Sequence, residues 1–515
     1  MNRTMKTGYL VLLFLFTVIY SYAQEPADAL RYSFLTEPGG TARNQAIGGA
    51  GGALGGEFTS LFINPAGLGF YKTGDFAFTP DFSFQNSKSN YLGNPGSAKN
   101  SSFSIGTTGF VLASPSAPGK KVKSFAIGFG INRMADFNNH VYYKGTNHSS
   151  SFSEQYLEQL ANDNVTNPND AATNYPDGAS LAFNTYLIDT LQNADGSIGG
   201  YKSEANPATG LIQENTINTS GGITDAAIGG GLNLKDKWYF GATLSFPFLN
   251  YNRNASYKES DASGNPNNNF NYFIANGTLQ TKGVGVDGKF GVIFKPVKDL
   301  SLGLAFHTPT YYQLTDNYNT KIITDLEGYG GEGVKHQSST DLNNGQQLQS
   351  KYSFNTPWRA ILSGAYVFGE VKNVQDQRGF VSADIEYVNY KDASFHDVNN
   401  DASAADYYNS LNKVIKDLYK NAINVRLGGE LKFNTIMFRL GGAYYGNPYQ
   451  NQSANLIKIS GGIGYRNRGM FLDLTYVYLT NKDINYPYML EDKPNVPAYL
   501  RNNAGNIVAS IGFKL

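Results

Sequence analysis

Apolar and polar residues alternate one by one in many segments between Asp75 and Leu515, and this pattern constrains the fold more than any other feature. In the first segment, phenylalanines stand at positions 76, 78, 82 and 84, with mostly polar residues between them. A two-residue period is that of a β-strand with one apolar and one polar face. The chain is therefore predicted to be all-β, either a soluble sandwich or a membrane barrel.

The connections between the predicted strands distinguish these two folds. We expect about fourteen strands, near residues 75–86, 101–113, 122–136, 222–234, 237–253, 272–296, 299–318, 347–369, 378–392, 419–433, 435–447, 456–467, 469–482 and 503–515. Long connections, at 137–221, 254–271, 319–346, 393–418 and 483–502, alternate with tight ones. An even strand number with long loops on one side only is typical of bacterial outer-membrane barrels. The predicted fold is therefore a transmembrane antiparallel β-barrel.

Charged residues in the predicted strands stand opposite the apolar ones, on the face that would line the lumen. They are Arg359, Asp384, Glu386, Arg426, Glu430, Arg439 and Asp473. A charge facing lipid at mid-membrane costs ~2–4 kcal/mol, which explains this segregation. Because both signs occur, we expect ion pairs that cross-link the wall and hold a plug, rather than an ion-selective ring of one sign. Tyrosines near strand ends fit the aromatic girdles of such barrels, for example Tyr311, Tyr312, Tyr444, Tyr445, Tyr476 and Tyr478.

Residues 1–23 have the pattern of a secretory signal peptide. Arg3 and Lys6 precede an apolar stretch, and Ser21-Tyr22-Ala23 resembles a small-residue cleavage site, so we expect cleavage after Ala23. No later apolar stretch approaches the ~20 residues of a membrane-spanning helix. The 41 basic residues equal the 41 acidic ones, which gives no reason to expect nucleic acid as a partner. With no cysteine in the chain, a disulfide framework is excluded.

Residues 24–72 differ from the rest of the chain in their density of glycine. They include the pairs Gly48-Gly49, Gly51-Gly52 and Gly55-Gly56 and then the turn Asn64-Pro65-Ala66-Gly67. Glycine disfavours regular structure but allows close approach of the backbone, so we predict a compact hatch that plugs a barrel formed by residues 73–515. The Asn-Pro turn is either a simple turn or one that also seats the hatch against the wall. A phosphate-binding loop is disfavoured, because Leu54 replaces the third glycine of that motif.

Candidate catalytic and metal-binding residues are scarce. Of the five histidines only His307 falls in a predicted strand, and none has a partner at the spacing of a zinc site. No nucleophile, base and orienting group can be assembled from the pattern. We therefore expect no enzymatic activity, no metal and no cofactor.

Several motifs, taken in order, resemble the FadL-type outer-membrane transporters of long-chain fatty acids and other hydrophobic compounds. They are the glycine-rich segment ending in Asn64-Pro65-Ala66-Gly67-Leu68, then Phe306-His307-Thr308-Pro309, Thr356-Pro357-Trp358-Arg359, Ser382 to Tyr387, Arg439 to Pro448, and Gly461 to Tyr465 followed by Leu472 to Tyr476. The resemblance covers nearly the whole chain after the signal peptide. It implies a fourteen-stranded barrel with an amino-terminal hatch, in the cell outer membrane.

The resemblance also implies a transport route. Members of the family release hydrophobic ligands through an opening in the wall where the third strand bends inward. Here that strand would include Gly128, Phe129 and Gly130, whose glycines permit a bend. The function expected is passive, hatch-gated uptake of fatty acids or similar molecules by a monomer in contact with outer-membrane lipid. Two alternatives remain: a solute porin, and an interaction or adhesion protein that acts through its long loops.

Overall fold

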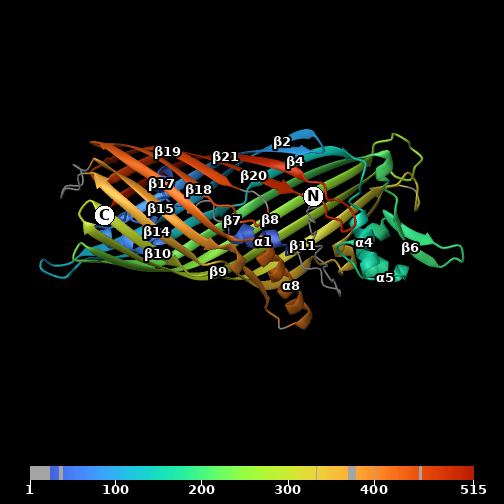
Figure 1. Ribbon diagram of the computed structural model, residues 1–515, viewed down its shortest axis with the longest axis horizontal. Helices are drawn as coiled ribbons and strands as arrows, with labels where there is room; N and C mark the ends of the chain where they lie inside the picture. Colours follow the sequence, from blue (N-terminus) through green and yellow to red (C-terminus); the bar gives the residue numbers. More distant parts are fainter. Residues whose placement is uncertain (1–23, 34–38, 332, 369–377, 400, 452–454) are drawn as a thin grey trace, which may run out of the picture.

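The chain forms a closed antiparallel β-barrel with fourteen staves, as predicted (Figure 1). The computed structural model describes residues 24–33, 39–331, 333–368, 378–399, 401–451 and 455–515. Nineteen strands belong to one sheet, because several staves consist of two consecutive strands. The first and last strands pair from Asp75 opposite Lys514 to Tyr91 opposite Ala498, which closes the barrel. Closure pairs the edges that an open sheet would expose to lipid.

The strands of the barrel are β1 (Asp75–Tyr91), β2 (Asn94–Pro115), β3 (Val122–Asp136), β4 (Asn139–Asn147), β7 (Leu211–Leu234), β8 (Trp238–Asp261), β9 (Tyr272–Val297), β10 (Leu300–His307), β11 (Tyr311–Asp325), β12 (Lys335–Ser338), β13 (Leu348–Asn355), β14 (Arg359–Phe368), β15 (Gly379–Asn389), β16 (Ser394–Asp397), β17 (Asn421–Phe433), β18 (Ile436–Tyr445), β19 (Leu456–Asn467), β20 (Met470–Asn485) and β21 (Ala498–Lys514). β3 and β4 both pair with β7, so they form one broken third stave.

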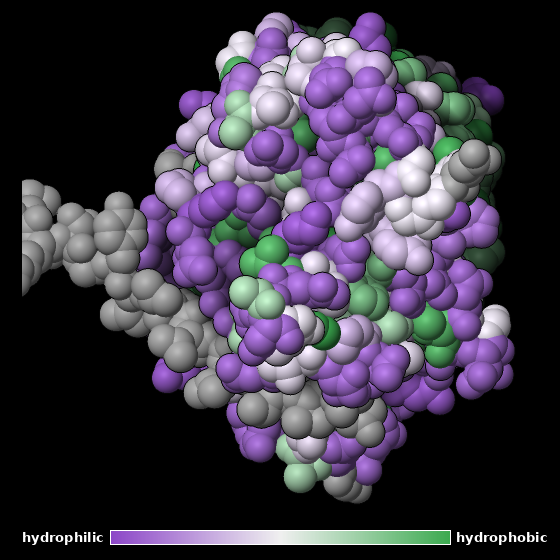
Figure 2. Space-filling view, turned by 90° about the vertical axis from the view of Figure 1, so that its right-hand side faces the viewer, coloured by the Kyte–Doolittle hydropathy of each residue, from purple (hydrophilic) through white to green (hydrophobic). Residues whose placement is uncertain are grey.

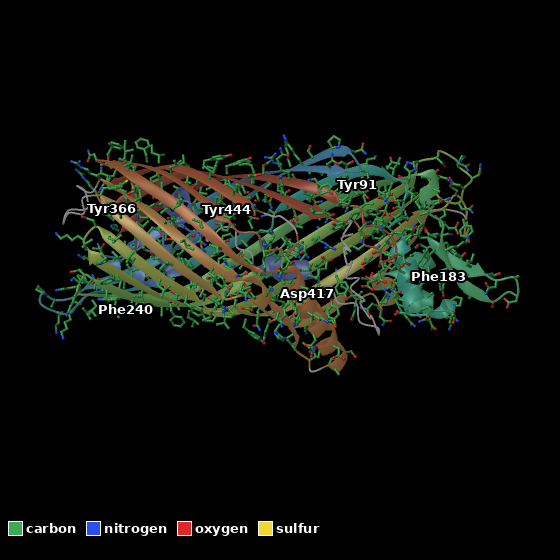
Figure 3. The ribbon with its side chains drawn as sticks, viewed as in Figure 1. Tyr91, Phe183, Phe240, Tyr366, Asp417 and Tyr444 are labelled. Atoms are coloured by element: carbon green, nitrogen blue, oxygen red, sulfur yellow. The ribbon has the colours of Figure 1, made fainter. Side chains whose placement is uncertain are left out.

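The outer surface of the barrel carries the apolar residues of the alternating pattern. Phe82 and Phe84 are each half exposed, and Phe240, Tyr366 and Tyr444 project outward from the wall in Figure 3. In two predicted girdle pairs only one tyrosine points outward. Tyr311 and Tyr444 are exposed, whereas the adjacent Tyr312 and Tyr445 are buried in the lumen, because successive side chains of a strand point to opposite faces.

Several strands continue well beyond the apolar band. β1 reaches Tyr91 and β2 begins at Asn94. A two-residue turn at Leu92 and Gly93, both with positive φ, therefore replaces the longer connection between the predicted strands 75–86 and 101–113. Most of the additional residues are polar on either face of the strand, with Tyr91 and Ala98 as buried exceptions, so the alternation by which strands are recognised is weak there. β8 likewise extends into the predicted connection 254–271 as far as Asp261, and β20 and β21 extend into 483–502.

The remaining long connections fold onto the end of the barrel opposite the carboxyl terminus. The connection between β4 and β7 contains α4 (Glu154–Asn162), α5 (Pro168–Thr173), α6 (Ala179–Asn184), the hairpin β5 (Ile188–Gln192) and β6 (Ile198–Ser203), and η2 (Pro207–Thr209). α7 (Ser339–Leu342) precedes β13, and η4 (Tyr390–Asp392) and α8 (Ala402–Leu418) lie between β15 and β17. This end is mostly hydrophilic (Figure 2). Within the described ranges, no helix has both the length and the apolar character required to cross a membrane.

Residues 24–33 and 39–71, here called the hatch segment, pack against the lumenal face of the wall. They form α1 (Pro26–Ser33), α2 (Ala42–Ala46), α3 (Ser60–Ile63) and η1 (Pro65–Phe70). Phe58, Leu61 and Leu68 are almost fully buried in a cluster with lumen-facing residues of the first strands, such as Ala77 and Val111. The hatch segment thus shares its apolar core with the barrel.

Candidate functional site

A row of glycines in the wall forms the seat of the Asn-Pro-Ala-Gly turn. Gly231 of β7 lies opposite Gly241 of β8, which lies opposite Gly291 of β9. A Cβ atom added at Gly231 would lie 2.7 Å from the amide nitrogen of Gly69 and 2.8 Å from the carbonyl oxygen of Pro65. Side chains at this row would therefore hold η1 away from the wall, and their absence allows backbone to lie directly on backbone.

Asn64 connects the hatch segment internally and faces the wall. It is 1% exposed, and its side-chain oxygen accepts a hydrogen bond from the Ala66 amide at 3.2 Å, which caps η1. Its side-chain nitrogen donates to the carbonyl oxygen of Gly52 at 2.7 Å. Both polar groups of the carboxamide are thus hydrogen-bonded. The turn that Asn64 begins is also the part of the hatch segment that rests on the glycine row of β7, β8 and β9.

Hydrogen bonds fasten the hatch segment around much of the wall. Wall hydroxyls bond to its backbone from β3, β8, β19, β20 and β21, through Ser124, Thr243, Ser460, Thr475 and Ser510. His307 at the end of β10 contacts the Ile63 carbonyl oxygen through Nε2 at 2.8 Å. Polar side chains on the lumenal face of several strands therefore provide hydrogen-bond partners for the backbone of a segment with little regular structure.

The first charge cluster joins four of the seven predicted lumenal charges. Arg359 and Arg426 approach the two carboxylate oxygens of Glu386 at 3.0 and 2.5 Å. Asp384 lies 4.0 Å from Arg426 and accepts a hydrogen bond from the Gly52 amide of the hatch segment at 3.1 Å. All four charged side chains are at least nine-tenths buried. The cluster thus cross-links β14, β15 and β17 and also binds the hatch segment.

The second cluster joins the other three predicted charges. Arg439 contacts Glu430 at 2.6 Å and Asp473 at 2.5 Å, so it connects β17, β18 and β20. Arg43 of the hatch segment lies 3.3 Å from Glu430. Each strand contributes one charge, and antiparallel pairing aligns them, since Glu430 is directly opposite Arg439.

A third cluster was not identified from the sequence. Lys289 of β9 is 2% exposed and contacts Asp225 of β7 at 2.9 Å and Asp287 at 2.8 Å. Gly288 precedes Lys289 in the chain, and the outward-facing Phe290, 53% exposed, follows it. Asp287, two residues before Lys289 on the same face of β9, would have been the available signal for one of the two contacts. Asp225 is 64 residues from Lys289 in the chain, so the other contact has no local signal.

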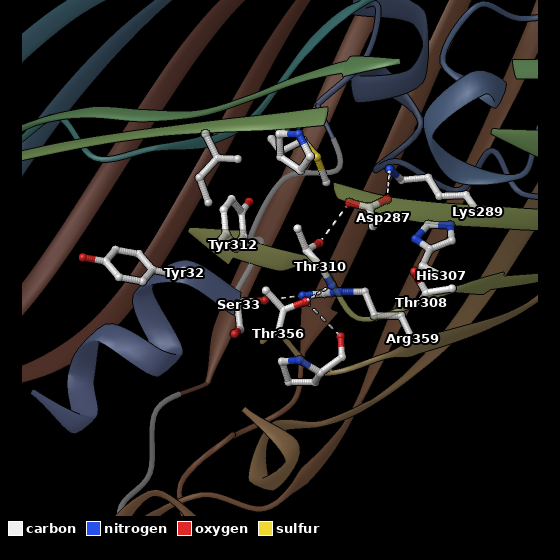
Figure 4. A pocket seen from close by; sticks show the side chains of 14 residues that line it. Tyr32, Ser33, Asp287, Lys289, His307, Thr308, Thr310, Tyr312, Thr356 and Arg359 are labelled. Atoms are coloured by element: carbon white, nitrogen blue, oxygen red, sulfur yellow. Dashed lines mark hydrogen bonds and ion pairs between the residues drawn. The ribbon is translucent and has the colours of Figure 1, made fainter. Parts of the chain in front are cut away.

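A small cavity lies between α1, this third cluster and the loop end of β14 (Figure 4). Its volume is about 40 Å³, and its lining includes Tyr32, Met134, His307, Thr310 and Arg359. Thr310 donates to Asp287 at 2.9 Å. At ~10–15 Å³ for each water, the cavity has room for a few waters. The described residues around this cavity therefore leave no space for a larger molecule.

α1 forms one side of the cavity and is held by several elements. The Tyr32 hydroxyl donates to Thr281 of β9 at 3.2 Å, and the Arg359 guanidinium donates to the Ser33 carbonyl oxygen. Gln24 is 3% exposed, donates to Asp316 at 2.6 Å and accepts from the Tyr408 hydroxyl of α8 at 3.1 Å. The start of the hatch segment therefore contacts both the wall and an outer loop.

The predicted opening residues Gly128, Phe129 and Gly130 lie in the fully paired part of the third stave. They are opposite Val111, Phe110 and Gly109 of β2, and they also pair with β7. Phe129 is exposed on the outer face. The two glycines face the hatch segment, where a Cβ atom at Gly130 would lie 2.6 Å from the Phe58 ring. These glycines therefore accommodate hatch side chains.

The third stave leaves β2 only two residues further on. Pairing of β2 with β3 ends at Thr107 opposite Asn132. Beyond this point β3 and β4 pair with β7 alone, and within the described residues no strand pairs with the outer edge of β2 from Asn94 to Gly106. Ser89 Oγ, on the lumenal face of β1, donates to the Tyr142 carbonyl oxygen of β4 at 2.6 Å. β4 thus lies on the lumenal side of the β1–β2 hairpin, and a seam separates the second and third staves.

The hatch segment and the cavity both reach this seam. The Gly40 amide donates to Asn132 Oδ1 at 2.8 Å and contacts Thr107 Oγ1 at 3.1 Å, at the last paired residues. Met134 is the extra residue of a bulge between β3 and β7, and its side chain lines the cavity. Bulges redirect side chains in this way.

Solved structures share this fold. A crystal structure of a Pseudomonas aeruginosa FadL homologue aligns with a TM-score of 0.53 at 14% identity, over 93% of this chain and 98% of the other. The Pseudomonas putida toluene transporter TodX aligns with a TM-score of 0.51 at 14% identity, over 93% and 99%. No protein-family model and no curated protein matches the sequence. The resemblance to FadL-type outer-membrane transporters is confirmed at the level of the fold.

Proposed function

We propose that this protein is a passive outer-membrane channel for hydrophobic small molecules and that the hatch segment gates it. The transported molecule leaves sideways, through the seam between β2 and the third stave. The observation that carries the proposal is the coincidence of three features at one place. The wall loses its pairing beyond Asn132, Met134 of the cavity lies beside that point, and Gly40 of the hatch segment binds the last paired residues.

Movement of the hatch segment would connect the cavity with the seam. The cavity of about 40 Å³ is far smaller than the roughly 300–1,000 Å³ typical of ligand pockets, so entry of a ligand requires rearrangement. A cavity of this size favours a gated channel over a permanently open porin. An apolar ligand that leaves through the seam passes directly to lipid, so it avoids re-exposure to water at ~25 cal/mol per Å² of apolar surface.

The substrate class follows from this route. Long-chain fatty acids and compact hydrocarbons such as toluene are both candidates, and the latter is the compound named for one structure of the same fold. The wall near the seam has an apolar outer face, with Phe110, Phe129 and Ile131 all exposed. This surface suits release of either type of molecule into the membrane.

Reversible tethering of the hatch segment tests the proposal. The Ala42 amide donates to Ser510 Oγ at 2.7 Å, so Ala42→Cys with Ser510→Cys places two thiols near each other in a chain without cysteine. Uptake of labelled fatty acid and of toluene is measured in cells that lack their own transporters. We expect uptake by the unmodified chain, its loss after oxidation of the double variant, and recovery on reduction.

The single variants Ala42→Cys and Ser510→Cys are the matched controls and should be insensitive to oxidation. Uptake that persists with the tether shown to be formed would refute gating by the hatch segment. Absence of uptake for both compounds, with the protein folded in the outer membrane, would refute the substrate classes and favour interaction through the long loops.

A further inference from the structure

Four basic side chains gather on the outer face of four neighbouring strands. Lys88 of β1 lies directly opposite Arg501 of β21, which lies opposite Lys482 of β20. Lys99 of β2 is opposite Asn86, one outward-facing position below Lys88. All four side chains are exposed. At ~4.8 Å between strands, the group, here called the basic patch, spans about 14 Å.

The basic patch has no acidic counterpart. No outward-facing position of β1, β2, β20 or β21 carries an acid, since Asp81, Asp473 and Asp483 all alternate to the lumenal face. None of the four cations forms an ion pair with another described residue; the surface pair Lys144 and Glu214 on β4 and β7, 3.2 Å apart, shows the contrasting arrangement. Like charges directly opposite in a sheet are destabilising, so the patch favours a bound anion.

The height of the basic patch in the membrane indicates which anion. Directly below it the same strands expose lipid-facing aromatic residues, with Phe84 50% and Phe103 57% exposed. Lys88 is four residues beyond Phe84, which is about 13 Å along a strand and about 10 Å of height at a tilt of ~40°. The headgroup layer begins at the edge of the hydrocarbon core and is several ångströms deep. The cations therefore lie at headgroup level on the side of the barrel that carries the loops.

We infer that the basic patch is a binding site for a phosphorylated lipid of the outer leaflet, whose phosphates lie against Lys88, Arg501 and Lys482 while its acyl chains cover the aromatic residues below. Charge complementarity selects the phosphate, and the continuous apolar surface selects a ligand that also has acyl chains. Arginine binds phosphate bidentately and lysine acts as a point charge. The four strands follow one another along the wall in the order β20, β21, β1 and β2, and Figure 1 labels three of them, β20, β21 and β2, on the same side of the barrel.

Lipid binding to the purified full-length protein in detergent tests this inference. The probe is lipid A with two phosphates, compared with its dephosphorylated form, and bound lipid is counted by native mass spectrometry. We expect the phosphorylated form to bind more tightly, and more weakly as salt rises. The double variant Lys88→Gln with Arg501→Gln should reduce affinity about thirtyfold, which corresponds to ~1 kcal/mol for each cation at a membrane surface.

Two lysines elsewhere on the wall provide a matched control. Lys282 and Lys351 are exposed on the strands that flank Thr315, so they are separated by one strand instead of being directly opposite a like charge. Lys282→Gln with Lys351→Gln should leave the affinity unchanged. Equal binding of the two lipid forms, or equal loss in both double variants, would overturn the proposal. Displacement of the lipid by millimolar inorganic phosphate would also overturn it, because the site would then recognise a free anion.

Discussion

Replacing Gly231 by alanine should lift the hatch segment from its seat. The added Cβ would lie 2.7 Å from the Gly69 nitrogen and 2.8 Å from the Pro65 oxygen, whereas ordinary contact begins at 3.4 Å. The turn must therefore move by 3.4 − 2.7 = 0.7 Å, and the neighbouring atoms are backbone, which cannot rotate away. Overpacking of this kind costs about 1–3 kcal/mol. We expect lower stability together with more frequent ion conductance.

The neighbouring residue provides the control for this variant. Gly230 lies in the same strand with its Cβ direction toward the outer face, where the nearest atom would be at an ordinary 3.5 Å. Gly230→Ala should raise stability by about 0.5–1 kcal/mol, because glycine is unfavourable inside a strand. Stability is measured by urea unfolding in vesicles, and conductance is measured in planar bilayers. If both alanine variants behave alike in both assays, the seat does not hold the hatch segment.

Three further predictions concern other contacts. Asn64→Leu removes both hydrogen bonds of the buried carboxamide and should increase conductance in the same bilayers; unchanged conductance would reduce Asn64 to a simple turn residue. Arg439→Gln leaves the buried carboxylates of Glu430 and Asp473 without their shared partner. The free energy of unfolding in urea should therefore fall by ~3–5 kcal/mol. A loss below about 1 kcal/mol, as for an ion pair on the surface, would contradict this. Burial raises the pKa of Asp177, between α5 and α6, to about 6 from 3.8. The protonated form is favoured in the fold, so protection of residues 154–184 from hydrogen exchange should be greatest near pH 4 and fall as pH rises through 6; Asp177→Asn should abolish this dependence.

The alternation of residues was sufficient to predict the barrel, because lipid outside and polar contacts inside impose opposite demands on successive side chains. The same demand placed all seven predicted charges on the lumenal face. The alternation does not reveal a strand where both of its faces meet the same environment. Residues 87–90 of the first strand are polar on both sides, so the alternation predicts its end at residue 86, whereas the strand continues to Tyr91.

The pairing of charges depended on register, which the local pattern does not contain. Glu430 and Arg439 are close because a tight turn joins their strands, and this pair is readable from the sequence. Asp225 and Lys289 are 64 residues apart and meet across β8, so only the closed sheet brings them together.

By itself the sequence determined that this chain is a β-barrel preceded by a glycine-rich segment with little regular structure, since periodicity and backbone freedom are local properties. Only the tertiary structure decided where the third stave leaves its neighbour. Gly128 and Gly130 lie in the fully paired part of β3, and the pairing with β2 ends at Asn132, whose side-chain oxygen accepts a hydrogen bond from the Gly40 amide of the hatch segment. The position of the seam results from contacts between segments about ninety residues apart, which no local pattern of residues specifies.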